Sequence, residues 1–300
     1  MARAVQRRRG VVPRIKSLLP TLKGTLRDVA EYILQNPSSV IGLSTSEIAG
    51  LTGTSEAAAV RLAQRLGYRG FRELQINMAY DLGDKTPKVQ QEIEAGDDVA
   101  TLAEKTHSAL VEALTDSYRM LDVSALELAV DAMAGARRLI LLGQGANTAQ
   151  VVDLNYNLTK LGLSVIVYVD PYMQTAAASL CEPGDVVLGI SHTGANRDLV
   201  EAFLIAKGYG AKTICLTMHP GTPLSRVADI TLTAAPKEIV FKGEPFTSRI
   251  SLMYLVDLLF IGVGLRRREA KKNLQRVQEA LASKRYPFDG PTGDGESSQN

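Results

Sequence analysis

The second half of the chain alternates short apolar runs with helical segments, and this pattern restricts the possible folds more than any other feature. Five β-prone runs occur after residue 135, at residues 138–143, 164–169, 186–190, 212–217 and 229–233. Uninterrupted apolar runs indicate strands that helices cover on both faces, which is typical of a parallel sheet. We therefore predict an α/β unit with a five-stranded parallel sheet in the flavodoxin-like order 2-1-3-4-5.

Two polar loops follow the first and third of these runs, at residues 143–148 and 191–196. Their small and hydroxyl residues leave backbone N–H groups accessible at a helix N-terminus, where the helix dipole also favours negative charge. Because strands 1 and 3 are neighbours in the predicted order, both loops should face one pocket for a phosphorylated small molecule. The candidate ligand-binding residues are Gly143, Gly145, Asn147, Thr148, Ser191, His192, Thr193 and Asn196.

Each loop also has a purely structural interpretation. Gly143 and Gly145 are compatible with tight packing of a strand against its helix, and Ser191 and Asn196 are both able to cap a helix. A dinucleotide site is a further alternative, since the first loop begins Gly-x-Gly and Asp170 ends the next strand. Thr148 occupies the third glycine position of that fingerprint, which counts against it.

The first 82 residues are predicted to form helices separated by turns. Ser44 and Glu47 have the spacing of a capping box at the start of one short helix. That helix stops near Gly53, which provides the positive φ that such a turn needs. Ser55 is placed to cap a second helix, which ends at Gly67. Two short helices joined by a turn of about four residues are the helix-turn-helix signature.

The formal charge is divided unevenly between these two parts. Residues 1–85 hold 13 Lys and Arg against 7 Asp and Glu, whereas residues 86–300 hold 21 against 25. A basic segment joined to an acidic remainder favours contact with a polyanion, although a solvated basic face gives the same count. The second helix of the motif is expected to enter the major groove of DNA. Its candidate contacts are Ser55, Glu56, Ala57, Ala59, Arg61, Arg65 and Arg69, with Arg72 and the arm Arg7–Arg9 as further phosphate contacts.

These patterns predict four regions: a helix-turn-helix domain at 1–82, a linker at 83–98, an α/β domain at 99–286 and a disordered tail at 287–300. Cys181 and Cys215 lie in apolar surroundings, which indicates buried thiols in a reducing compartment. No apolar run has the length of a membrane span or a signal peptide, so we expect a cytoplasmic protein. The histidines lack metal-ligand spacing, and no cofactor or metal is expected.

Residues 190–196, Ile-Ser-His-Thr-Gly-Ala-Asn, resemble the Ile-Ser-x-Ser-Gly-x-Thr segment of SIS (sugar isomerase) domains. Residues 43–49, Leu-Ser-Thr-Ser-Glu-Ile-Ala, and residues 65–71, Arg-Leu-Gly-Tyr-Arg-Gly-Phe, resemble the helix-turn-helix of the RpiR family. The resemblance implies a bacterial transcriptional regulator whose SIS domain senses a phosphosugar, with Ser191 and Thr193 holding the phosphate. Asn196 stands where the family usually has Thr, and Asn147 where it often has Ser, so the identity of the ligand stays open.

Two functions remain after these considerations. The first is a DNA-binding regulator of carbohydrate genes, a homodimer or homotetramer on a palindromic operator, in which the sugar phosphate changes how the SIS domains pack. The second is a sugar-phosphate isomerase or lyase that uses the same pocket. That chemistry needs a general base, for which Glu244 and His192 are the candidates. Because an enzyme has little use for a basic helix-turn-helix, we favour the regulator.

Overall fold

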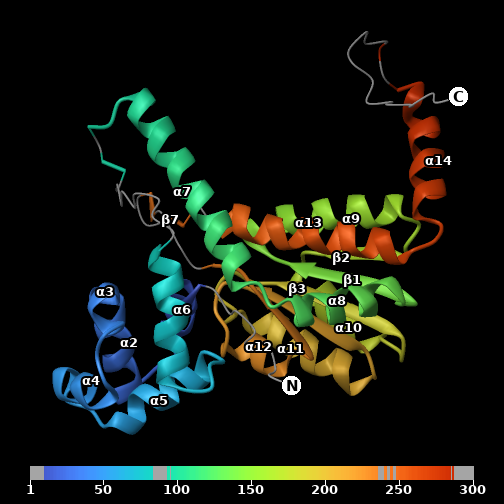
Figure 1. The fold of residues 1–300 in the computed structure, drawn as a ribbon. Coiled ribbons are helices and arrows are strands. Elements are labelled where there is room, and N and C mark those ends of the chain that lie inside the picture. Colours follow the sequence, from blue (N-terminus) through green and yellow to red (C-terminus); the bar gives the residue numbers. More distant parts are fainter. Residues whose placement is uncertain are drawn as a thin grey trace, which may run out of the picture.

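In the computed structural model, an N-terminal helical unit lies beside a C-terminal α/β unit (Figure 1). The structure describes residues 10–83, 93–94, 96–235, 240–241, 244–245, 248–284 and 286. The predicted arm Arg7–Arg9, the predicted tail at 287–300 and most of the predicted linker lie outside the described residues. The last helix of the N-terminal unit ends at Gly83, and the next helix begins at Val99. The linker boundaries therefore stay a prediction.

The N-terminal unit consists of short helices around one apolar core. Buried side chains at helical spacing, among them Ile15, Ile33, Ile48, Leu62 and Leu74, draw the helices together. The elements are α1 (Val11–Leu18), the 3₁₀ turn η1 (Leu19–Thr21), α2 (Thr25–Gln35), α3 (Pro37–Val40), α4 (Thr45–Thr52), α5 (Glu56–Arg65) and α6 (Phe71–Gly83). The Asp81 carboxylate of α6 accepts hydrogen bonds from the backbone N–H groups of Gly10 and Val11, so it fastens the start of α1 to α6.

Helices α4 and α5 form the predicted helix-turn-helix. The predicted capping box is present, because Ser44 Oγ accepts from the backbone N–H of Glu47 and the Glu47 carboxylate accepts from the backbone N–H of Ser44. Gly53 ends α4 with a φ of +63°, as the turn requires. Ser55 occupies the N-cap position of α5, but its side chain makes no capping hydrogen bond.

The C-terminal unit contains the predicted five-stranded parallel sheet. Its strands are β1 (Arg138–Gly143), β2 (Val165–Tyr168), β3 (Asp185–Ile190), β4 (Lys212–Thr217) and β5 (Ile230–Thr233). They pair in parallel in the order β2-β1-β3-β4-β5, which confirms the predicted flavodoxin-like order. A separate two-stranded sheet joins β6 (Val240–Phe241) to β7 (Glu244–Pro245). Successive strand residues face opposite helical layers, so the runs are apolar throughout.

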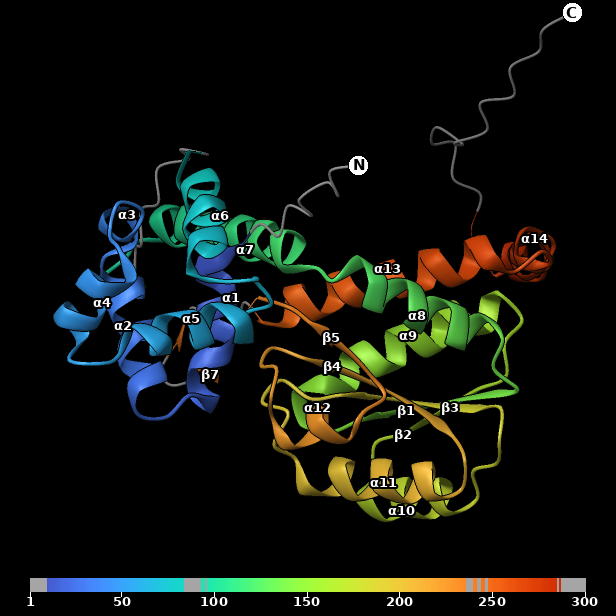
Figure 2. The same cartoon turned by 60° about the horizontal axis from the view of Figure 1, so that its bottom comes forward.

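Helices cover both faces of the sheet (Figure 2). One layer contains α8 (Val123–Ala134), α9 (Thr148–Lys160) and α13 (Ser248–Arg266), which share a core with Leu139 and Leu141 of β1. The other contains α10 (Pro171–Ser179), α11 (Arg197–Gly208) and α12 (Pro223–Val227), which share a core with Ile140 and Leu142. The remaining helices are α7 (Val99–Met120) and α14 (Ala270–Ala282), and the 3₁₀ turn η2 (Gly145–Asn147) precedes α9.

The end of the chain, the two cysteines and the apolar helices of this unit can be compared with the sequence. The chain turns at residues 267–269, and this turn separates α13 from α14. Cys181 and Cys215 are free and buried, as predicted, and burial raises the pKa of the Cys215 thiol to about 12. Within the part of the chain that the structure describes, no helix is long and apolar enough to cross a membrane.

Candidate functional site

The two polar loops meet at the carboxyl edge of the sheet. Parallel pairing sets Gly143, at the end of β1, opposite Ile190, at the end of β3. The loops that follow are joined by a hydrogen bond of 2.8 Å from Asn196 Nδ2 to Gln144 Oε1. The two loops are therefore neighbours, as the strand order predicted. Whether the eight candidate residues bind a ligand stays a prediction.

In the first loop, the two glycines have different roles. A Cβ on Gly143 would lie 2.9 Å from Val151 Cγ1 and 3.0 Å from the backbone oxygen of Asn147, so strand-to-helix packing requires glycine there. Gly145 has a φ of +56°, and a Cβ built on it would meet no atom within 4 Å. Asn147 and Thr148 are half-buried, and Asn147 makes no capping hydrogen bond to α9.

The second loop is held by its own side chains. Ser191 is buried, and its hydroxyl accepts a hydrogen bond of 3.1 Å from the backbone N–H of Gly194. Thr193 is exposed, and its hydroxyl accepts from the backbone N–H of Ala195. Asn196 Oδ1 accepts from the backbone N–H of Leu199, so Asn196 caps α11. The capping interpretation is thus correct for Asn196, whose amide nitrogen at the same time reaches the first loop.

Gln144, which the sequence reasoning did not select, connects both loops to the protein interior. Its amide Nε2 donates to Gln174 Oε1 at 2.9 Å and approaches Asp198 Oδ2 at 3.4 Å. Gln174 is completely buried in α10 and donates in turn to the backbone oxygen of Tyr168 at the end of β2. Gln174 lies thirty residues from Gln144 in the sequence. The only signal in the sequence for this hydrogen bond is that each glutamine lies shortly after a strand of the parallel sheet.

His192 faces the segment between β4 and α12. Its half-buried ring lies edge-on to the ring of His219, with 6.0 Å between the centroids. The backbone oxygen of His192 accepts hydrogen bonds from the backbone N–H of Met218 and from Thr217 Oγ1. Among the described residues, no group of three or more His, Cys, Asp or Glu side chains could hold a metal ion.

Helix α5 presents one polar face to solvent and one apolar face to the core. Ser55, Glu56, Ala57, Arg61 and Arg65 are exposed, whereas Ala58, Ala59, Leu62 and Ala63 are buried. The prediction that Ala59 contacts DNA is wrong, because Ala59 is fully buried against the neighbouring helices.

Two of the other predicted DNA contacts already have partners within the protein. Glu56 Oε2 accepts a hydrogen bond of 2.8 Å from Thr45 Oγ1, so this carboxylate joins the two helices of the motif. Arg69 is highly exposed but pairs with Glu73, whose carboxylate lies 3.3 Å from Arg69 Nε. Arg61 and Arg65 are the two basic residues of α5, and both are exposed.

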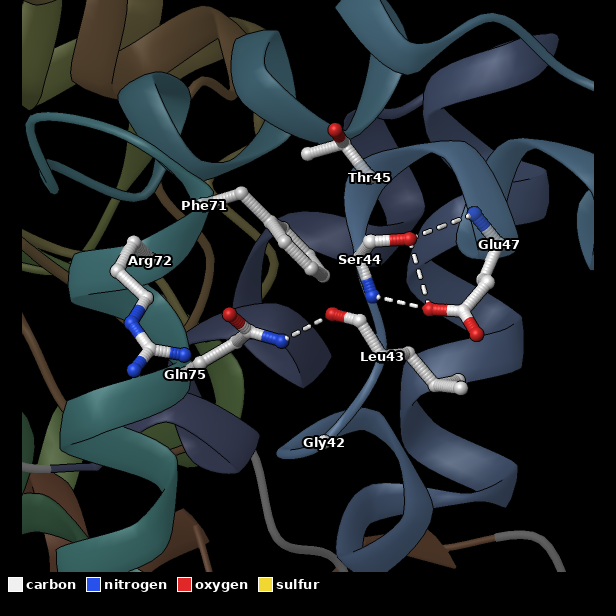
Figure 3. Close-up of a pocket in the computed structure, with 8 residues that line it drawn as sticks. All are labelled: Gly42, Leu43, Ser44, Thr45, Glu47, Phe71, Arg72 and Gln75. Carbon is white, nitrogen blue, oxygen red and sulfur yellow. Dashed lines mark hydrogen bonds between the residues drawn. The ribbon is translucent and has the colours of Figure 1, made fainter.

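A cleft of about 360 Å³ lies in the helical unit, between the start of α4 and the start of α6 (Figure 3). Gln75 Nε2 donates to the backbone oxygen of Leu43 on its floor. At one side, hydrogen bonds from the backbone N–H and hydroxyl of Ser44 lower the pKa of Glu47. None of the candidate ligand residues lines this cleft. The hydrogen bond from Gln75 to Leu43 connects α6 to the residue that directly precedes the capping box.

A helix-turn-helix joined to a five-stranded α/β unit is typical of a two-domain transcriptional regulator. Comparison with protein families agrees: residues 9–85 match the helix-turn-helix domain of the rpiR family, and residues 132–262 match the SIS domain. The regulator HexR of Pseudomonas aeruginosa is 32% identical over 282 residues, which cover 94% of this chain and 99% of that protein. The chain belongs to the rpiR family of helix-turn-helix transcriptional regulators.

Two solved structures are similar to this chain, one over most of its length and one over the SIS domain. The NanR protein of Vibrio vulnificus, complexed with ManNAc-6P, is 26% identical with a TM-score of 0.59, over 92% of this chain and 100% of that one. The sugar isomerase domain of an RpiR transcription factor from Sphaerobacter thermophilus is 27% identical with a TM-score of 0.55, over 59% of this chain and 98% of that one.

Proposed function

We propose that this regulator controls genes of carbohydrate metabolism in response to a phosphosugar bound at the carboxyl edge of the SIS sheet. The observation that carries the proposal is the convergence of residues 143–148 and 191–196, joined by the bond between Asn196 and Gln144. The complex of NanR with ManNAc-6P, a similar protein of the same two-part build, supports this class of effector.

The two loops offer neutral donors rather than fixed charges to an anion. The Thr193 hydroxyl is exposed, and the Ser191 hydroxyl accepts from the backbone N–H of Gly194 while retaining its own hydrogen for donation. Helices α9 and α11 both begin at these loops, so their dipoles favour a negative charge there. We assign the phosphate to Ser191 and Thr193, and the sugar to the first loop with Asn147 and Thr148.

Binding of the effector is tested by the shift of the melting temperature with N-acetylmannosamine 6-phosphate and a panel of hexose and pentose phosphates. We expect one of them to raise it, and Ser191→Ala and Thr193→Ala to reduce that shift. Ser108→Ala, at an exposed serine of α7, is the matched control and should respond as the wild type does. If no sugar phosphate shifts the transition, or if both loop variants respond fully, the assigned pocket is wrong.

For DNA, we propose that α5 enters the major groove with Arg61 and Arg65 on its outer face, and that Arg69 and Arg72 contact phosphates. A homodimer or homotetramer would then present paired helices to a palindromic operator. Arg61→Ala and Arg65→Ala should each weaken binding to a selected operator about tenfold or more. Arg27→Ala, which removes an exposed arginine of α2 paired with Glu31, is the control and should leave the affinity unchanged.

We also infer that the pocket senses its ligand and does not convert it. The similar full-length proteins are named transcriptional regulators, and the His192 ring packs against His219. The side chain of Glu244, the other candidate base, lies outside the described residues. Turnover of any bound sugar phosphate by the purified chain would contradict this inference.

Because bacterial DNA lies in the cytoplasm, we propose that the regulator acts there.

A further inference from the structure

One segment of the SIS domain contacts both the second loop and the DNA-binding unit. We call residues 217–224, from the last residue of β4 to the first turn of α12, the bridging segment. On the side of the loop, its backbone N–H groups at Met218 and Leu224 donate to the backbone oxygens of His192 and Gly194, at 3.1 and 3.0 Å. The bridging segment is therefore fixed to the second loop at two separate points of its backbone.

The contact at Gly194 leaves almost no space. A Cβ on Gly194 would lie 2.1 Å from Thr222 Oγ1 and 2.8 Å from Thr222 Cβ. Gly194 is buried and has a φ of +63°, a conformation that L side chains rarely adopt. Because packed surfaces transmit displacement and do not absorb it, a shift of this loop has to move Thr222 as well.

On its other side, the bridging segment contacts α1. Ser17 Oγ donates a hydrogen bond of 2.8 Å to the backbone oxygen of Met218, and both residues are completely buried. His219 Nδ1 lies 3.1 Å from the backbone oxygen of Ser17. Since a carbonyl oxygen can only accept, Nδ1 carries a hydrogen in this contact. The ring of His219 thus touches α1 at one edge and His192 of the second loop on another side.

Helix α1 is in turn fastened to the rest of the DNA-binding unit. Asp81 of α6 holds the first backbone N–H groups of α1, and α6 packs against α5. A continuous chain of contacts therefore runs from the second loop through His219 and α1 to the helix that carries Arg61 and Arg65. Every link in it is a described contact within one protomer.

We propose that the bridging segment is an intramolecular relay, in which His219 and Ser17 are positioning residues that couple occupancy of the second loop to the placement of the DNA-binding unit. The proposal rests on the function proposed above and adds the route of regulation. A change of packing between SIS domains is then not needed for the response. Coupling requires that the effector have different affinities for the two placements of the DNA-binding unit. The factor by which the effector changes the affinity for DNA must then equal the factor by which DNA changes the affinity for the effector.

The test measures the dissociation constant for a selected operator with and without the sugar phosphate that gives the largest melting shift, using the full chain. The ratio of the two constants is the coupling factor, for which about 5- to 150-fold is typical. We expect His219→Ala and Ser17→Ala to bring it to within about twofold of unity, with DNA affinity in the absence of sugar and the melting shift retained. His219→Asn keeps a donor for the Ser17 oxygen and should restore most of the coupling.

His107→Ala, at an exposed histidine of α7, is the matched control and should keep the full coupling factor. A second measurement needs no sugar: amide hydrogen exchange of residues 191–196, with and without saturating operator. The relay predicts that DNA alters this exchange in the wild type and not in His219→Ala. Full coupling in both relay variants, or no effect of DNA on the loop, would overturn the relay. Absence of any sugar-phosphate binding would instead overturn the proposed function, and the exchange experiment still decides the relay.

Discussion

The two loops at the carboxyl edge of the sheet have similar sequences and different surroundings. Each has a glycine in the left-handed region, Gly145 at +56° and Gly194 at +63°, and each has an asparagine just before a helix. Gly145 has open space where its Cβ would be, whereas Gly194 lies against Thr222. Asn196 caps its helix, and Asn147 does not. The first loop therefore borders open space at its left-handed glycine, whereas the second is packed against the bridging segment there.

This difference indicates that the two loops have different roles in binding a sugar phosphate. A loop that is packed against a neighbouring segment can pass on a displacement caused by ligand binding. A loop that borders open space can accommodate differently shaped ligands. We expect the second loop to hold the group common to all sugar phosphates, and the first loop to select the sugar. Matched substitutions in the two loops test this division, because the same chemical change meets different neighbours.

Gly194→Ala should have the largest effect. Its methyl group would meet Thr222 and its φ would be strained, so the free energy of unfolding of the SIS domain should fall by about 3 kcal/mol or more. Calorimetry of the full chain measures this change as a lower melting temperature of that domain. The double variant with Thr222→Gly removes the clash but not the strain, and should recover part of the loss. A stable Gly194→Ala protein would show that the second loop is not locked.

Gln144→Glu should have the second largest effect, because it affects both loops at once. A carboxylate still accepts from Asn196 Nδ2, but it cannot donate to Gln174 Oε1 and it places a charge beside Asp198. Loss of the bond to the buried amide should cost about 2 kcal/mol of stability. The added charge should also repel the phosphate, so the melting shift with sugar phosphate should disappear. Gln278→Glu adds the same charge at an exposed site of α14, and retention of the shift is expected there.

The sequence allowed the sheet to be predicted because uninterrupted apolar runs mark buried parallel strands, whose order brings residues 143 and 190 together. The capping box was predictable for a similar reason, since Ser44 and Glu47 are three residues apart and interact locally. In both cases the decisive interactions are either local or imposed by regular pairing. The sheet and the capping box do not depend on the position of one side chain that is distant in the sequence.

The remaining features depend on contacts between distant residues. Ala59 was predicted to face DNA, but the rotation of α5 against α2 and α6 decides which alanines of one turn are buried. The partner of Gln144 is thirty residues away on α10, and the partner of Ser17 lies beyond residue 200. No local pattern in the sequence marks either pair.

Asn196→Ala and Asn147→Ala test the comparison at the two helix starts. Asn196 loses both its cap of α11 and its bond to Gln144, which should cost about 1 to 2 kcal/mol. Asn147 makes no capping bond, and its replacement should change stability by less than about 0.5 kcal/mol. Urea unfolding followed by circular dichroism compares the pair under one set of conditions. Equal losses in the two variants would mean that the loops are held alike.

Gly145→Ala should have a much smaller effect than Gly194→Ala. Its methyl group meets no atom, so only the left-handed conformation costs energy, about 1 kcal/mol. Gly145→Asn should cost less, because asparagine adopts this conformation more readily than alanine, although its side chain is larger. Stability should therefore decrease in the order Gly, Asn, Ala. If the first loop selects the sugar, affinity should instead decrease with side-chain size, in the order Gly, Ala, Asn. Titration calorimetry with the best sugar phosphate separates the two orders, and affinity that follows stability would mean that the ligand does not approach Gly145.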